Sequence, residues 1–136
     1  MTATGIPHAA SACIDACLHC YRTCLQTAMN HCLETGGRHV EPSHFRLITN
    51  CAQMCRTTAD FMLSSSHLHG RICAACAEVC GACADSCEQI GEMDECVRAC
   101  RECEQSCRRM ANGQLYGDVG ERASHAGAGQ QGQLLM

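Results

Sequence analysis

The sequence predicts an all-α protein, an antiparallel four-helix bundle with a core lined by cysteine. Sixteen of the 136 residues are cysteine. Most of them recur at alternating steps of three and four, and because a helix turns about 100° per residue, such steps return to one face. Glycine, proline and serine punctuate the chain into segments of helical length. Four helices joined by short connections most simply form an up-and-down bundle.

The first predicted helix covers about residues 8–35 and ends at Gly36-Gly37, a strong helix stop. At helical pitch Cys32 falls about 80–100° away from the cysteine stripe of this segment, whereas His31 falls on it. Cys32 is therefore the cysteine that the spacing supports least. The cysteines of the stripe itself are Cys13, Cys17, Cys20 and Cys24.

The second predicted helix follows Pro42, with Ser43 available near the cap, and runs to about Leu63, where a serine triplet breaks it. This segment keeps the stripe but changes its chemistry, because only two of the inward positions are thiols. Those inward positions are His44, Ile48, Cys51, Cys55, Thr58 and Met62.

The third and fourth predicted helices cover about residues 68–90 and 93–111 and are separated by Gly91. The bundle domain is accordingly predicted over 1–111, and the Gly-rich remainder, 112–136, is predicted as a C-terminal tail. The thiol stripes of the two helices are Cys73, Cys76, Cys80, Cys83 and Cys87, then Cys96, Cys100, Cys103 and Cys107.

Composition excludes several classes of protein. The net charge of −4 is spread without a basic stripe, which argues against a nucleic-acid partner. No apolar run approaches the length of about eighteen residues that a membrane span needs. The first eighteen residues contain no Lys or Arg and no uninterrupted apolar stretch, so they do not read as a secretory signal. We therefore expect a cytoplasmic protein with reduced thiols.

Soft thiolates select Cu(I), zinc and iron–sulfur centres. Zinc knuckles carry turn-forming residues between their cysteines, whereas the cysteine pairs of this chain are separated by helix-forming residues. The compact cysteine runs that bind iron–sulfur clusters are absent from the sequence. Cu(I) accepts two or three sulfurs with little geometric demand, so a ladder of thiols suits a chain of cuprous ions. Inert packing explains single buried cysteines, but sixteen would sacrifice apolar contact. A thiol-disulfide redox protein and a zinc-binding, metallothionein-like store remain the alternatives.

A known family shares these features. The C-x₃-C-x₂-C-x₃-C runs, and the segment His67-Leu68-His69-Gly70 leading into Cys73, resemble the cytosolic branch of the bacterial copper storage proteins. The resemblance covers about residues 8–111. It implies a four-helix bundle that holds many Cu(I) ions inside by its cysteines, and it implies a homotetramer.

The topology also predicts an entrance for copper. The start of the first helix, the end of the second, the start of the third and the end of the fourth share one end of the bundle. His and Met suit transient capture of Cu(I) from a copper chaperone or a small-thiol donor. No catalytic constellation competes with the thiol ladder, so we expect a store rather than an enzyme. That end gathers Cys13, Asp60, Met62, His67, His69, Cys73, Cys107 and Met110, and the opposite end offers His31, His44 and Met93.

Overall fold

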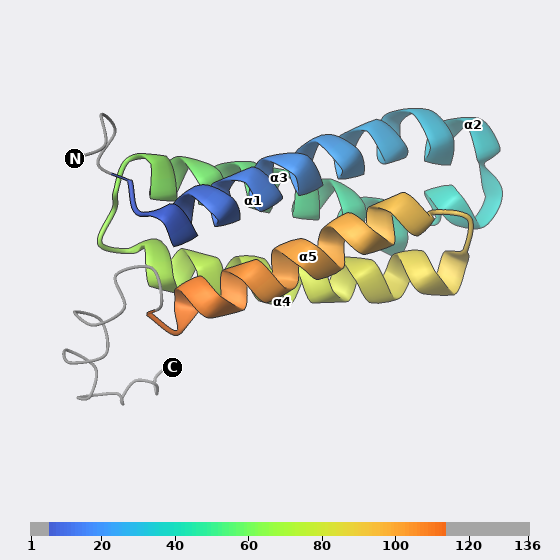
Figure 1. Ribbon diagram of the computed structural model, residues 1–136. Helices are drawn as coiled ribbons and strands as arrows, with labels where there is room; N and C mark the ends of the chain where they lie inside the picture. The colour runs from blue at the N-terminus through green and yellow to red at the C-terminus, as the bar shows by residue number, and fades with distance from the viewer. Residues whose placement is uncertain (1–5, 114–136) are drawn as a thin grey trace.

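The computed structural model describes residues 6–113, and this part of the chain is built from helices (Figure 1). The predicted tail over 112–136 lies, beyond Gly113, outside the described residues. Within 6–113 no helix has the length and apolar character needed to cross a bilayer. In chain order the elements are α1 (His8–Gln26), a π-helical stretch (Thr27–Cys32), α2 (Leu33–Thr35), a 3-10 helix (Gly37–Val40), α3 (Pro42–Leu63), α4 (His69–Ile90) and α5 (Asp94–Ala111).

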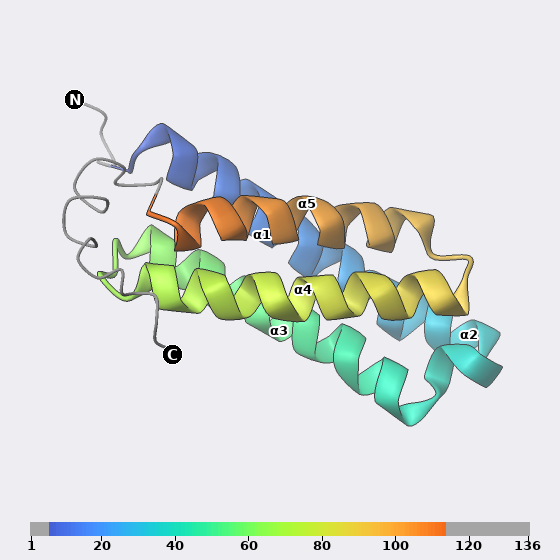
Figure 2. The ribbon, with the colours of Figure 1, turned by 90° about the horizontal axis from the view of Figure 1, so that it is seen from below.

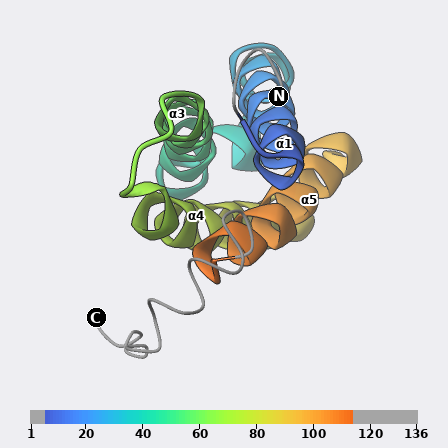
Figure 3. The ribbon, with the colours of Figure 1, turned by 60° about the vertical axis from the view of Figure 1, so that its left-hand side comes forward.

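The long helices form an up-and-down bundle. The rod made by α1, the π-helical stretch and α2 packs against α3 and α5, and α4 packs against the same two neighbours. Seen toward its end, the bundle has one helix at each corner (Figure 3). Figure 2 shows α4 and α5 side by side along their length. The predicted fold class is confirmed.

Glycines end the helices where the sequence predicted. Gly36 and Gly37 have φ of 70° and 57°, and Gly91 has φ of 91°, a left-handed region that glycine adopts without strain. The predicted cap of α3 is wrong in its residue. Glu41, not Ser43, caps the helix, because its Oε1 accepts the backbone N–H of His44 at 3.2 Å and the hydroxyl of Ser43 at 2.6 Å.

Cysteine takes the place of leucine in the core. All sixteen cysteines have 0% exposure and none forms a disulfide. A thiol is smaller than an isobutyl group, so the helices must approach closely to leave no void, and small residues beside the thiols allow this. The buried alanines are Ala10, Ala28, Ala52, Ala59, Ala77, Ala84 and Ala99.

Gly81 permits close approach of α4 and α5. A Cβ at this position would lie 2.7 Å from Oε2 of Glu104 on α5. Glu104 in turn accepts from Arg101 at 3.3 Å and from Arg108 at 2.7 Å. Arg101 also pairs with Asp85 on α4 at 2.6 Å. The pair of Arg101 with Asp85 joins α4 to α5 and is partly exposed, so it adds specificity to this contact more than stability, whereas both pairs of Glu104 lie within α5.

Candidate metal centre

The inward thiols form a continuous column along the bundle axis. Neighbouring Sγ atoms are separated by 3.4 Å between Cys55 and Cys80, and by up to 4.0 Å between Cys20 and Cys51. Many of these contacts join different helices, for example Cys24 of α1 to Cys96 of α5 at 3.5 Å. The periodic stripes predicted from the sequence therefore face one another, as an inward stripe on each helix of a bundle requires.

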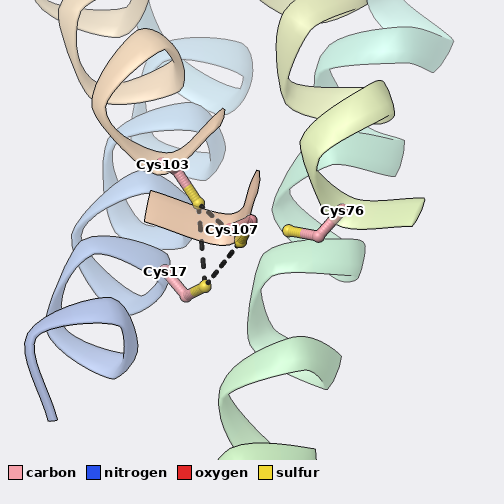
Figure 4. A group of neighbouring side chains, drawn as sticks. All are labelled: Cys17, Cys76, Cys103 and Cys107. Carbon is pink, nitrogen blue, oxygen red and sulfur yellow. Dashed lines mark hydrogen bonds between the residues drawn. The ribbon is translucent and has the colours of Figure 1, made fainter. Parts of the chain in front are cut away.

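The column contains overlapping groups of four thiols whose sulfurs all lie within 4.8 Å of one another. Figure 4 shows one of them, with the side chains of α1, α4 and α5 pointing toward a common centre. Neighbouring groups share members, so the sites are not isolated cages but a chain of linked positions. The groups are Cys17, Cys76, Cys103 and Cys107; Cys20, Cys24, Cys51 and Cys100; Cys20, Cys55, Cys80 and Cys103; and Cys24, Cys83, Cys96 and Cys100.

Cys32 joins the core, contrary to the position that helical pitch predicted. The helix turns π-helical over Thr27–Cys32, and the wider turn rotates the following residues relative to the α-helical stripe. Cys32 is consequently buried, with its Sγ 3.7 Å from Sδ of Met93 and 3.9 Å from Nε2 of His44. His31, which pitch placed on the stripe, is only half-buried.

Residues of the predicted entrance separate into two kinds. Met62 and Met110 are buried beside the column, and Sδ of Met62 lies 3.9 Å from Sγ of Cys73. His69 is buried, and its Nδ1 lies 3.1 Å from the carbonyl oxygen of Ser66. The other two, His67 and Asp60, are exposed. At the same end, Cys13 lies 3.8 Å from Cys107 and closes the column.

The opposite end of the bundle contains more potential metal-binding side chains than the sequence indicated. His44 is buried, its Nδ1 is 2.8 Å from Oγ of Ser86, and its Nε2 faces Cys32. A surface pocket of about 280 Å³ beside the α4–α5 connection is lined in part by Cys87 and Gly91. Sequence reasoning did not single out His39 or Glu92, which also lie here, because neither falls on a helical stripe.

Burial and sulfur contacts control the ionisation of the thiols. Burial raises the pKa of Cys32 to about 11, and the negative charge of Cys96 would add to that effect. The pKa of Cys24 is raised by its hydrogen bond with Cys100, and that of Cys55 by its hydrogen bond with Cys103. These three thiols are therefore neutral near pH 7 in the empty protein. Burial also lowers the pKa of His44, which keeps its imidazole neutral and able to bind metal.

Comparison with known proteins now identifies the family. Residues 6–112 match the model of the copper storage protein family. The chain belongs to the copper storage protein family. It is similar to the crystal structure of the Nmul_A1745 protein from Nitrosospira multiformis, at 59% identity and a TM-score of 0.75, over 76% of this chain and 94% of that one.

Two further members of the copper storage protein family have similar structures. The Cu(I)-bound copper storage protein BsCsp3 is 33% identical, with a TM-score of 0.71, over 76% of this chain and 99% of that one. The apo form of Csp3 from Bacillus subtilis is 34% identical, with a TM-score of 0.68, over 74% and 97%. An uncharacterized cysteine-rich protein of B. subtilis, YhjQ, is 35% identical over 68 residues, which span 50% of this chain and 62% of that relative.

Proposed function

We propose that this copper storage family protein holds many Cu(I) ions along its thiol column and keeps them out of solution. One observation carries the proposal: sixteen fully buried, unbridged cysteines line the core, and twelve of them meet in overlapping groups of four. A single-site chaperone needs only one exposed pair of thiols, and a catalyst needs an open position beside a general base. The column differs from both, since it repeats the thiol ligand many times and every thiol is buried. We infer a store and not an enzyme.

Charge balance favours Cu(I) over zinc as the cargo. Each Cu(I) that replaces the proton of one thiol leaves the core neutral, with one proton released to solvent. A zinc ion held by four thiolates would leave two negative charges in the same dry interior, and uncompensated buried charge is costly. Sulfur separations of 3.4 to 4.0 Å suit ions bridged by shared thiolates, so copper enters with little movement of the helices.

A thiol-disulfide redox protein is the competing function, and a count of thiols separates the two. Most thiols in the column have several neighbours at similar distances, such as Cys100 with Cys24 at 3.6 Å and with Cys20 at 3.8 Å, so no dedicated pair stands out. After mild oxidation of the apo protein, we expect no preferred, stoichiometric loss of two thiols. Selective loss of one pair, reversible by reductant and matched by slow uptake of Cu(I), would favour the redox function.

We also propose that copper enters at the end formed by the start of α1, the end of α3, the start of α4 and the end of α5. Met62 and His69 support this, because Met62 is a soft donor in contact with Cys73, the first thiol of α4, and His69 is a borderline donor one helical turn before Cys73. His67 and Asp60 are exposed at this end, where they can receive an ion from a copper chaperone or a small-thiol donor. Met110 is the third buried donor at this end, together with Met62 and His69.

Replacement of His69 by alanine tests this entrance. We expect slower Cu(I) uptake in stopped-flow measurements, with a final copper content within about one or two ions of the parent, because His69 captures ions but the thiolates retain them. His44→Ala, which removes a buried imidazole at the opposite end, is the matched control and should leave the rate unchanged. A slower rate in His44→Ala alone would move the entrance to that end.

A homotetramer in the cytoplasm completes the proposal, as the family resemblance implies. Leu18, Leu25, Met29 and Leu33 form an exposed apolar row along the α1 rod, which a second copy of the chain would cover. Light scattering should give the mass of four chains, and a monomeric mass at micromolar concentration would contradict the assembly.

A further inference from the structure

A second group of metal-binding side chains lies outside the thiol column. It consists of His31 from the π-helical stretch, His39 from the 3-10 helix and Glu92 from the α4–α5 connection. One ring nitrogen of each histidine and one carboxylate oxygen of Glu92 all lie within 4.8 Å of one another. The group contains no sulfur, so its chemistry differs from that of the column. Figure 1 shows α2 and the α4–α5 connection at the same end of the bundle.

Each of the two imidazoles has one ring nitrogen without a hydrogen bond to any residue of the described range, 6–113. These buried nitrogens are Nε2 of His31 and Nδ1 of His39. His39 is itself 6% exposed, so water does not freely compensate the missing contact. Its Nε2 faces Oε1 of Glu92 at 3.4 Å, and the rings meet edge to face with centroids 4.9 Å apart. The nitrogen of His39 that can share an ion with Glu92 is therefore Nε2, and the unpaired Nε2 of His31 is free to join it.

The local backbone is held in unusual conformations that bring these three donors together. Glu92 has φ of 65°, which is unfavourable for a residue with a Cβ, and it directly follows Gly91. The π-helical stretch, which turns Cys32 inward, also determines the direction of His31. Arg38, beside His39, donates to the carbonyl oxygens of Gln89 and Ile90 at the end of α4. This link fastens the 3-10 helix against the α4–α5 connection.

We infer that His31, His39 and Glu92 bind one divalent cation of the zinc class, separately from the Cu(I) column. Two imidazoles and one carboxylate are a borderline ligand set that suits Zn(II), whereas Cu(I) prefers sulfur. With bonds of about 2.0 to 2.1 Å, two ligands of a tetrahedral ion lie about 3.3 to 3.4 Å apart. The 3.4 Å between His39 and Glu92 matches that separation. Glu92 is exposed, so a water molecule can take the fourth position.

Such an ion would join three segments at one end of the bundle. It would tie the α4–α5 connection, which carries Glu92, to the 3-10 helix with His39 and to the π-helical stretch with His31. Cys32 and Met93 are the immediate chain neighbours of two of the ligands, so the ion would also fix the outermost sulfurs of the column. We assign it a structural role at this end.

Titration of the Cu(I)-saturated protein with Zn(II) tests the inference, because the thiols are then occupied. Calorimetry should detect one Zn(II) per chain in the parent. His39→Ala and Glu92→Gly should weaken this binding by at least about tenfold, as expected when a ligand is removed. Glu92→Gly also relieves the left-handed backbone, so its apo form should melt no lower than the parent. His19→Ala removes an exposed histidine on α1 and should bind Zn(II) like the parent.

Co(II) gives the same test an independent readout that does not depend on copper storage. Added to apo protein, cobalt at the histidine site shows ligand-field bands without sulfur-to-metal charge transfer, and thiolate-bound cobalt shows both. If Glu92→Gly loses only the ligand-field bands that have no accompanying charge transfer from sulfur, the histidine site is supported. This result does not depend on whether the protein stores copper. The inference is overturned if the parent binds no Zn(II), if Glu92→Gly binds it equally well, or if His39→Ala lowers only the Cu(I) content.

Discussion

Loading with Cu(I) is expected to raise the melting temperature by more than about 20 °C while leaving the helical circular dichroism nearly unchanged. An ion present at about a thousand times its Kd stabilises the folded state by about 4 kcal/mol, and about 1 kcal/mol shifts the midpoint of a domain this size by about 4 °C. Several tightly bound ions together therefore raise the melting temperature by more than about 20 °C. The helices are expected to change little because the thiols lie close enough to share an ion without a shift of the backbone, as Cys55 and Cys80 do at 3.4 Å.

Anaerobic circular dichroism on apo and loaded protein, melted under identical conditions, checks this expectation. Ser106→Ala is a suitable control, because Ser106 is buried on α5 next to Cys107 but supplies no thiol. It should show the same shift as the parent. A random-coil spectrum for the apo protein would mean that metal drives folding, as in zinc fingers, and that no preformed column exists.

Much of the fold could be predicted because one physical rule governs it. A step of three or four residues returns to one helix face, so the spacing of Cys73, Cys76 and Cys80 determined both the helix and its inward side. Gly36 and Gly91 marked the ends, since their left-handed backbone suits glycine. Short connections make successive helices antiparallel neighbours, and this topology brings the cysteine stripes of different helices into contact.

The misplaced residues lie where helical pitch changes or where the chain leaves the helices. Cys32 was predicted off the stripe because regular pitch was assumed, and the π-helical turn before it carries no sequence signal of its own. Glu41 caps α3 with its longer side chain although Ser43 is the commoner capping residue type. His39 and Glu92 belong to connections, whose meeting in space depends on tertiary packing rather than on periodicity.

The capacity for Cu(I) is the second large effect. If each thiolate bridges two ions and each ion takes two sulfurs, the column holds about one ion per cysteine, or about sixteen ions, plus a few at the entrance. Because neighbouring ions share thiolates, one substitution in the middle of the column should remove more Cu(I) ions than one at its end. Cys100 belongs to two of the four-thiol groups, whereas Cys32 lies outside them at the end, beside Met93 and His44.

A matched pair of variants uses this difference. Cys100→Ser should lower the copper content by about two ions, and Cys32→Ser by about one, because the remaining sulfurs still hold partial sites. Both variants should keep their helical circular dichroism, since serine fits in the space of cysteine. Collapse of all binding in Cys100→Ser would indicate one cooperative cluster instead of a ladder.

The ratio of copper to protein tests the account most directly. Apo protein is titrated anaerobically with Cu(I) in the presence of a chromophoric competitor, and the bound metal is then measured after gel filtration. The thiol column predicts about sixteen tightly held ions per chain, with a few weaker ones. A ratio of one or two, with the competitor taking the rest, would contradict storage and leave the buried cysteines as packing.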